Sequence, residues 1–201
     1  MATTPETALT AGRAQNEPMS VIITGGLGCV GLAITSCLSK RLSHANLHVL
    51  DVSLPNDRHD FENNDNEEDE RLHKDVTQYH KIDVTDYASI LEVFHVVKPR
   101  VVIHTAALIP NAAKKLGVGD EGLTKTNVGG TQNVLDAARD VGAEILILTS
   151  SCDVVKKNSW KDLVNVSEKD DDLDANAVWD EKYPETKVTS HDYSTARGNF
   201  V

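Results

Sequence analysis

Glycine residues between Thr24 and Gly31 carry the clearest chemical signal in this 201-residue sequence. The segment TGGLGCVG follows a short β-branched apolar run and precedes a segment with apolar residues at helical spacing. This arrangement predicts a strand, a tight turn and a helix. In such a unit Gly25 permits the turn, Gly28 lets the backbone approach a pyrophosphate, and Gly31 lets the helix pack closely on the sheet.

An acidic residue follows where a dinucleotide site requires one. Asp51 lies twenty residues beyond Gly31, at the end of the next predicted strand, where its carboxylate would accept hydrogen bonds from an adenosine ribose. The same charge would repel a 2′-phosphate, so we expect NAD rather than NADP as the cofactor. The phosphates would lie against the backbone of Leu27, Cys29 and Val30. A structural glycine turn that binds no nucleotide is the alternative.

A tyrosine and a lysine form a second group with chemical potential. Tyr183 and Lys187 stand four residues apart in the sequence YPETK, and Pro184 suits the first turn of a helix, so both side chains would lie on one helix face. A free tyrosine has a pKa of about 10. A neighbouring ammonium favours the phenolate, which lets tyrosine exchange a proton with an alcohol near neutral pH. On its own, such a pair is more often surface decoration than a catalyst.

The segments that would position these residues alternate between strands and helices. Apolar runs predict strands over residues 19–23, 47–50, 80–82, 100–104 and 144–148, and helical periodicity predicts helices over 29–42, 87–97 and 120–140. We therefore predict an α/β fold with a doubly wound parallel sheet, right-handed crossovers and helices on both faces. Ligands bind outside the carboxyl ends of such strands, which here carry Thr24, Asp51, Asp83, His104 and Thr149.

Two pairs of residues near these strand ends are further candidates for cofactor contacts. Asp83 and Val84 could flank an adenine ring, and Ala106 and Ala107 offer small side chains where a cofactor passes close to the backbone. An ordinary loop is the alternative for each pair.

These features together resemble the extended short-chain dehydrogenase/reductase superfamily, over roughly residues 19 to 190. The segments VIHTAA (102–107), NVGGT (127–131) and LTSS (148–151) are most similar to its branch of 3β-hydroxysteroid dehydrogenases and sterol-4α-carboxylate 3-dehydrogenases, and nucleotide-sugar epimerases share much of the pattern. The resemblance implies an NAD-dependent oxidoreductase that oxidises a secondary alcohol of a 3β-hydroxysteroid-like or polycyclic terpenoid substrate to a ketone. A nucleotide-sugar epimerase or dehydratase, or a catalytically inactive NAD-binding chain, are the alternatives.

The resemblance also implies roles for individual residues. Tyr183 would be the general acid/base, and Lys187 would bind the nicotinamide ribose and lower the tyrosine pKa. Ser151, with Ser150 as the alternative, would hold the substrate oxygen. Asn127 would be a structural or proton-relay residue on the long helix. The hydride chemistry would belong to NAD, while the protein supplies orientation and a proton path.

The sequence departs from the family at its carboxyl end. Family members usually continue with a sixth strand and a C-terminal lobe that shapes the substrate pocket, whereas this sequence ends at Val201. We therefore expect a C-terminally truncated, cofactor-binding half that lacks the usual last strand or strands and the substrate lobe. A second copy could cover the open side by dimerising through the long helices, so a homodimer is possible.

The charge distribution excludes some partners. The net charge is −11, and two acidic runs, residues 55–75 and 167–182, account for all of it. Such runs inside a balanced chain are typical of solvated loops. Because the surface as a whole would repel a phosphate backbone, we expect a small-molecule substrate and no nucleic acid.

Cysteine content and hydropathy suggest the compartment. The three cysteines have no spacing typical of a metal site or a redox dithiol, which favours a reducing environment and no metal. Residues 1–18 are polar and punctuated by proline, so we predict a disordered leader followed by one NAD-binding domain over 19–201. The sequence has neither a signal peptide nor a run of about 20 apolar residues, so we expect a cytoplasmic protein without a transmembrane segment.

Overall fold

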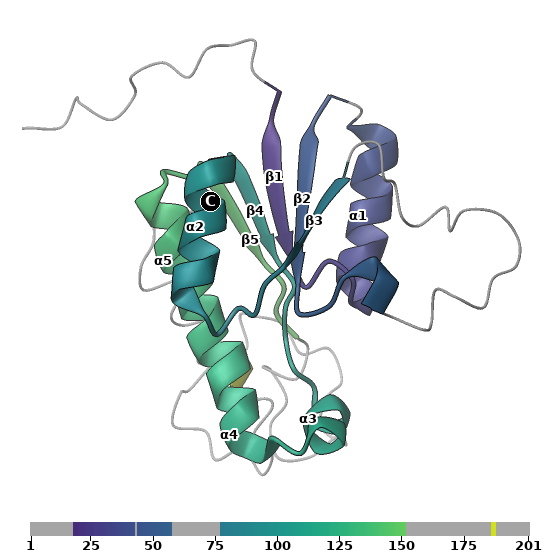
Figure 1. The fold of residues 1–201 in the computed structure, drawn as a ribbon, viewed down its shortest axis with the longest axis vertical. Coiled ribbons are helices and arrows are strands. Elements are labelled where there is room, and N and C mark those ends of the chain that lie inside the picture. The colour runs from purple at the N-terminus through teal and green to yellow at the C-terminus, as the bar shows by residue number, and fades with distance from the viewer. Residues whose placement is uncertain (1–17, 43, 58–76, 152–185, 188–201) are drawn as a thin grey trace, which may run out of the picture.

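A parallel sheet, with five strands in the part of the chain that the structure describes, forms the centre of the molecule (Figure 1). The computed structural model describes residues 18–42, 44–57, 77–151 and 186–187. Its strands are β1 (Ser20–Thr24), β2 (Asn46–Asp51), β3 (Thr77–Lys81), β4 (Val101–His104) and β5 (Ile145–Leu148). Their spatial order is β3-β2-β1-β4-β5, so the chain changes direction across the sheet between β1 and β4. The doubly wound parallel α/β fold is thereby confirmed, and ligands of such folds bind where the direction changes.

Helices cover both faces of the sheet and extend past its carboxyl edge. The helices are α1 (Cys29–Arg41), α2 (Tyr87–Val97), α3 (Pro110–Leu116), α4 (Gly119–Thr124) and α5 (Gly130–Asp140), and a 3-10 turn, Pro55–Asp57, follows β2. Helix α1 lies on one side of the sheet and α2 and α5 lie together on the other, while α3 and α4 lie beyond the carboxyl ends of the strands (Figure 1). A π-helical turn, Lys125–Gly129, joins α4 to α5.

Two hydrophobic cores explain why the strand sequences are almost continuously apolar. Alternate residues of β1 serve opposite faces: Ile22 packs in the core under α2 and α5, whereas Val21 and Ile23 pack in the core on the α1 side. Phe94 of α2 and Val134 of α5 are fully buried in the first core. A strand covered on both faces needs apolar side chains at successive positions, as these strands have.

Three features differ from the pattern predicted by the sequence. Strand β3 begins at Thr77 and ends at Lys81, so Asp83 lies two residues beyond it rather than at its end. The expected helix over 120–140 is divided by the π-helical turn. Helix α3 was not predicted, although Pro110 stands at its start and Gly117, with φ +67°, at its end, which is the usual arrangement of proline and glycine at helix ends.

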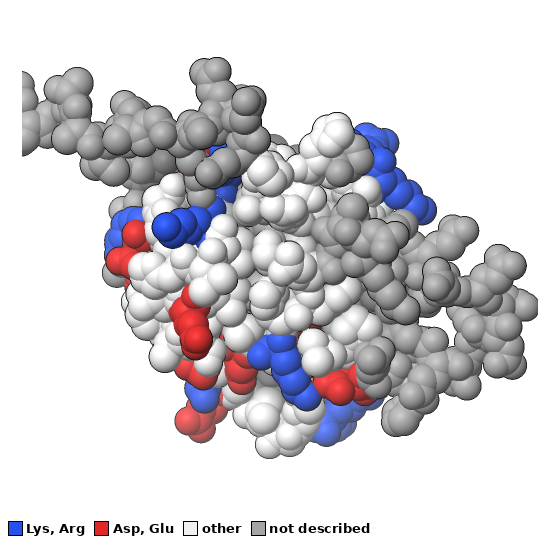
Figure 2. All heavy atoms as spheres, turned by 45° about the horizontal axis from the view of Figure 1, so that its top comes forward, with Lys and Arg blue, Asp and Glu red and all other residues white. Residues whose placement is uncertain are grey.

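Charges of both signs occur on the described surface. On the face shown in Figure 2, basic and acidic side chains are interspersed among uncharged ones, as expected for a chain whose excess acid lies in two runs. Most of those runs lie outside the described residues, as does nearly all of the predicted leader. Within the described part of the chain, no helix is long and apolar enough to cross a membrane.

Candidate active site

The turn after β1 depends on glycine at two places where a side chain would collide with backbone. Gly25 has φ +67°, and a Cβ there would lie 2.6 Å from the Cα of Ala106, in the loop after β4. A Cβ at Gly31 would lie 2.6 Å from the Cα of Gly26 and closer still to the carbonyl oxygen of Gly25. Gly31 therefore lets α1 approach the glycine loop itself, whereas the sequence had suggested close approach to the sheet.

The other two glycines of the loop differ in their surroundings. A Cβ at Gly26 would lie 2.7 Å from the Val49 side chain of β2, so the loop needs this glycine to pack on the sheet. Gly26 was not among the residues predicted from the sequence, and the doublet Gly25-Gly26 was the available signal. At Gly28 a Cβ would meet, among the described residues, only the Gly25 carbonyl oxygen, at 3.1 Å. Of the four glycines, Gly28 is the least crowded by this part of the chain, which leaves room for a ligand to approach the backbone.

Asp51 ties the glycine loop to the end of β2. Its Oδ2 accepts a hydrogen bond from the Leu27 amide at 3.0 Å, and its Oδ1 accepts from the amide and hydroxyl of Ser53, each at 3.3 Å. The Gly25 amide also donates to the Leu50 carbonyl at 2.7 Å. The carboxylate predicted to contact a ribose thus also fixes the loop that would hold the phosphates.

The start of α1 is suited to an anion. Gly28 occupies the cap position without a side-chain cap hydrogen bond, and the first turn has no acidic residue. The first amides of a helix have no partner within the helix and lie at the positive end of its dipole. These residues therefore fit the pyrophosphate of a dinucleotide. Cys29 and Val30, the first two residues of α1, are both exposed there.

His104 connects the end of β1 to α5 through a buried chain of hydrogen bonds. Its Nδ1 lies 2.6 Å from the Thr24 hydroxyl and its Nε2 lies 3.0 Å from the Thr131 hydroxyl. The hydroxyl of Thr131 donates its proton to the Asn127 carbonyl at 2.6 Å, so it can only accept from the histidine. The imidazole therefore carries its proton on Nε2 and accepts from Thr24 at Nδ1.

The buried imidazole of His104 is neutral. Its side chain is almost fully buried, and burial, followed by the positive charge of Lys187, lowers its pKa to about 3. Both causes oppose a second proton on the ring. At neutral pH the donor and acceptor roles of its two nitrogens are therefore fixed.

Asn127 lies in the π-helical turn and holds the loop after β4. Its Oδ1 accepts from the Leu108 amide at 2.7 Å, and its Nδ2 donates to the Leu108 carbonyl at 3.0 Å. The same Nδ2 donates to the Thr186 hydroxyl at 3.0 Å. Single π-helical turns are frequent at functional sites. These contacts give Asn127 a structural function, one of the two roles suggested by the sequence.

Lys187 lies buried at the carboxyl end of β5. Its Nζ donates to the Thr149 carbonyl at 3.3 Å, and burial lowers its pKa. Thr149 in turn donates to the His104 carbonyl through its amide, at 3.0 Å, and through its hydroxyl, at 2.8 Å. Ser150 is exposed and Ser151 is half-buried just beyond. Tyr183, the predicted acid/base, lies outside the described residues.

The remaining candidates, Asp83, Val84 and Ala106, lie in the segments that follow β3 and β4. Asp83 accepts a hydrogen bond from the Thr85 amide at 2.8 Å and so closes the turn before α2. The Val84 side chain is buried in the core and faces Gly130 of α5. Ala106 presents its backbone to Gly25. The structure therefore gives each of these residues a packing or turn contact within the protein.

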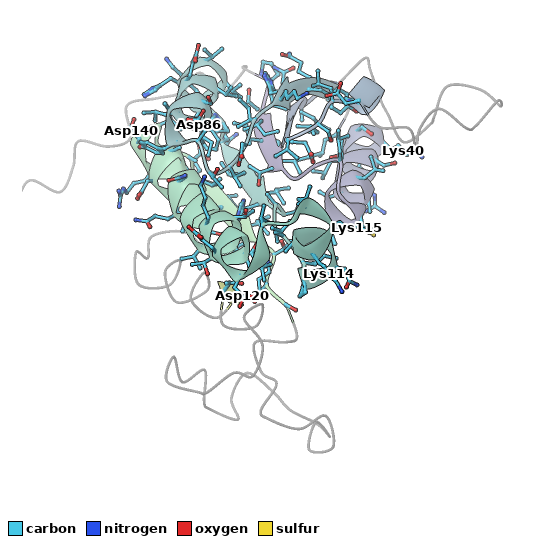
Figure 3. The ribbon with its side chains drawn as sticks, turned by 60° about the horizontal axis from the view of Figure 1, so that its bottom comes forward. Lys40, Asp86, Lys114, Lys115, Asp120 and Asp140 are labelled. Atoms are coloured by element: carbon cyan, nitrogen blue, oxygen red, sulfur yellow. The ribbon has the colours of Figure 1, made fainter. Side chains whose placement is uncertain are left out.

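Lysines of α3 mark the region beyond the strand ends. Figure 3 looks onto this end of the molecule and shows Lys114 and Lys115 on α3 and Asp120 on α4.

Among the described residues, no group of three or more His, Cys, Asp or Glu side chains could hold a metal ion. The site therefore consists of the glycine loop with Asp51 on one side and Lys187 with Thr149 on the other, joined through the end of β4.

Sequence comparisons with known proteins show the family of this chain. The sequence profile of the 3-beta hydroxysteroid dehydrogenase/isomerase family matches residues 22–199. The chain is 33% identical over 151 residues to the decarboxylating sterol-4-alpha-carboxylate 3-dehydrogenase erg26 of Schizosaccharomyces pombe, covering 75% of this chain and 38% of that protein. It is also 33% identical over 151 residues to the 3 beta-hydroxysteroid dehydrogenase type 7 of Rattus norvegicus, covering 74% of this chain and 40% of that protein.

Solved structures support the fold. An epimerase from Methanothermobacter thermautotrophicus matches with a TM-score of 0.68 and 25% identity, covering 88% of this chain and 46% of that one. The UDP-glucose 4-epimerase of Thermus thermophilus, solved with NAD, matches with a TM-score of 0.64 and 21% identity, covering 87% of this chain and 49% of that one. The chain thus spans about two fifths of the curated relatives and about half of these solved chains. It belongs to the 3-beta hydroxysteroid dehydrogenase/isomerase family, a family of NAD(P)-dependent enzymes.

Proposed function

We propose that this chain forms the cofactor-binding part of an NAD-dependent oxidoreductase that oxidises a secondary alcohol to a ketone. The observation that carries the proposal is the position of Lys187, buried against Thr149 at the end of β5. The glycine loop lies at the end of β1, and only β4 separates β1 from β5. An elongated dinucleotide could therefore contact the loop with its phosphates and Lys187 with its nicotinamide ribose.

Each residue of the proposed site has a definite task. Asp51 accepts hydrogen bonds from the adenosine ribose, and the start of α1 holds the phosphates. Lys187 binds the second ribose and lowers the pKa of Tyr183, which takes the proton of the alcohol. Ser151 holds the substrate oxygen. When bound, NAD supplies the acceptor for the hydride.

The proposed substrate is a 3β-hydroxysteroid or a related polycyclic terpenoid alcohol. This choice is supported by the names of the two curated relatives, which refer to a sterol carboxylate and to 3β-hydroxysteroids. A nucleotide sugar is the other substrate class, and the dehydrogenase names of these relatives favour the steroid.

Cys29 and Cys37 are free, in keeping with the reducing cytoplasm that we propose as the location.

Calorimetric titration with NAD and NADP tests the cofactor assignment. We expect NAD to bind at least about tenfold more tightly, a difference of about 1.4 kcal/mol, because Asp51 repels the 2′-phosphate. Asp51→Asn, which keeps an oxygen for the Leu27 amide, should narrow this difference. Asp57→Asn, on the exposed turn after β2, should leave it unchanged. Equal affinity for both cofactors, or binding of neither, would contradict the proposal.

Turnover assays test the reaction class. The chain is incubated with NAD and a 3β-hydroxysteroid, and formation of NADH and of the ketone is followed, with Tyr183→Phe as the control. A parallel incubation with a nucleotide sugar is analysed for epimerised or dehydrated product. Conversion of the sugar but not the steroid would replace the proposed reaction with the alternative, and NAD binding without any turnover would indicate an inactive cofactor-binding chain.

A further inference from the structure

The His104 side chain links the glycine loop to the helix that carries Asn127. The three hydrogen bonds of this series all run in the same direction. The Thr24 hydroxyl donates to the imidazole, the imidazole donates to the Thr131 hydroxyl, and that hydroxyl donates to the Asn127 carbonyl. Hydrogen bonds aligned in series polarise one another and strengthen the chain. From Asn127 the path continues through its side chain to the Thr186 hydroxyl, next to Lys187.

The His104 backbone provides a second, separate path to Lys187. Its carbonyl accepts two hydrogen bonds from Thr149, at 3.0 Å from the amide and 2.8 Å from the hydroxyl. The Thr149 carbonyl then accepts from the Lys187 ammonium at 3.3 Å. Both paths from the glycine loop to Lys187 therefore pass through the same residue at the end of β4.

We propose that His104 is a positioning residue that keeps the glycine loop and Lys187 in register, so that the two ends of one dinucleotide are held together. The inference rests on the proposed function, because it assumes that a dinucleotide spans these two parts. Thr24 directly precedes the loop and pairs in the sheet with His104 itself. A displacement of the ring would therefore move the loop relative to Lys187.

Histidine meets requirements that simpler side chains do not. The site needs an acceptor facing Thr24 and a donor facing Thr131, on one rigid group that spans from β1 to α5. Asparagine and glutamine can each replace only one of these two hydrogen bonds. The asparagine oxygen would lie about where Nδ1 is and could accept from Thr24, whereas the glutamine nitrogen would lie about where Nε2 is and could donate to Thr131. An apolar side chain would leave two buried hydroxyls without this partner, which is costly.

Binding of two nucleotides to matched variants tests the proposal. ADP reaches the glycine loop but lacks the nicotinamide ribose, whereas NAD requires both parts. We expect His104→Leu to lower the affinity for NAD by a factor about ten times larger than the factor by which it lowers the affinity for ADP. In His104→Asn and His104→Gln, the ratio of these two factors should lie between that of His104→Leu and that of the unaltered protein. The control His48→Asn, at a buried histidine of β2, should alter neither affinity. Equal losses for NAD and ADP in the asparagine and glutamine variants, or no loss, would overturn the proposal.

Nitrogen NMR of the imidazole gives a readout that does not require a cofactor. In the unaltered chain His104 should show a protonated Nε2 and an unprotonated Nδ1 from neutral pH down to about 5. Thr131→Val removes the acceptor on α5 and should change this tautomer and shift the Gly25 amide resonance, although Thr131 does not hydrogen-bond to the loop. If the unaltered His104 shows the other tautomer, or if the Gly25 resonance does not shift in Thr131→Val, His104 does not couple the glycine loop to Lys187.

The two experiments separate the inference from the function on which it rests. If the unaltered chain binds neither nucleotide, the proposed function fails, and the NMR response of Gly25 to Thr131→Val still decides whether His104 couples the two parts. If both nucleotides bind and the affinities of the His104 variants fall together, the function stands and the positioning role is wrong. Should His104→Leu fail to fold, the asparagine and glutamine variants carry the comparison.

Discussion

Replacing Gly31 with alanine tests how tightly α1 packs against the glycine loop. A Cβ at this position would lie 2.6 Å from the Cα of Gly26 and closer still to the Gly25 carbonyl oxygen, whereas non-bonded carbon atoms are comfortable at about 3.5–4.0 Å. Both neighbours are backbone atoms, so no side chain can rotate away. The loop must move, and with it the amides that face the proposed phosphates.

The expected cost follows from overpacking. Forcing one extra methyl into a tightly packed place costs typically about 1–3 kcal/mol, and the rigid neighbours of Gly31 put this substitution at the upper end. We expect the free energy of unfolding to fall by about 2–3 kcal/mol, as measured by urea denaturation followed by circular dichroism. NAD affinity of the folded fraction should fall more than about tenfold, since the loop would lose its shape.

Two further glycines serve as matched controls for the same chemical change. Gly129 has helical angles, φ −62° and ψ −44°, and a methyl group added there would have no atom of the described residues within 4 Å apart from its chain neighbours and its own helical backbone, so Gly129→Ala should raise stability by about 0.4–1 kcal/mol. Gly142 also has open space among the residues that the structure describes, but its φ is +68°, so Gly142→Ala should cost about 1–2 kcal/mol through backbone strain alone. If Gly31→Ala proved as mild as Gly129→Ala, the close packing of α1 on the loop would be refuted.

Three other predictions have defined outcomes. Asn127→Leu leaves an amide and a carbonyl of the loop after β4 without their partner, and should lower the free energy of unfolding by about 2–4 kcal/mol in urea denaturation. The pKa of His48 is lowered from 6.5 to about 4 by burial and, to a smaller extent, by the neighbouring His80. Nδ1 of His48 lies 3.1 Å from Nε2 of His80. The unfolded chain therefore binds a proton at His48 that the folded chain does not, so the His48 contribution to stability should fall by about 1–2 kcal/mol as pH drops from 6.5 towards 4. Buried His104 adds a fall of its own in the same pH range, so the test is the difference between the unaltered chain and His80→Gln, whose pH profile should be less steep; equally steep profiles would contradict this. Gly130→Ala would place a Cβ 2.6 Å from the Val84 side chain, so its cost of about 1–2 kcal/mol should shrink in a Val84→Ala background, and additive effects in the double variant would argue against the contact.

Much of the fold could be predicted because its signals are local. Helix α2 occupies residues 87–97 as predicted, since Pro99 prevents its continuation. The strands β1, β2, β4 and β5 lie within a residue or two of the apolar runs that predicted them. Strand β3 was predicted less well because its sequence, TQYHK, is polar. An edge strand pairs on one side only and does not need the continuous apolar run of a central strand.

The glycine half of the candidate site was accessible for the same reason. Gly25, Gly28 and Gly31 function through the lack of a side chain, and this property is visible in the sequence whatever the surroundings. The π-helical turn was not accessible, because nothing within KTNVG (125–129) distinguishes it from an ordinary helical segment. Its asparagine pairs with a loop residue 19 positions earlier and with Thr186, 59 positions later.

The other half of the site is built from buried polar side chains whose functions exist only through distant partners. His104 was named from the sequence as a strand end, yet the two hydrogen-bond partners of its side chain lie 80 and 27 positions away. Such contacts are specified by the order of the strands: β4 ends between β1 and β5, so one side chain at that place can reach the glycine loop while its carbonyl reaches Thr149. Because the topology sets this meeting point, substitutions in the glycine half should act mainly through collision, and those at His104 mainly through lost hydrogen bonds that a partial replacement can restore.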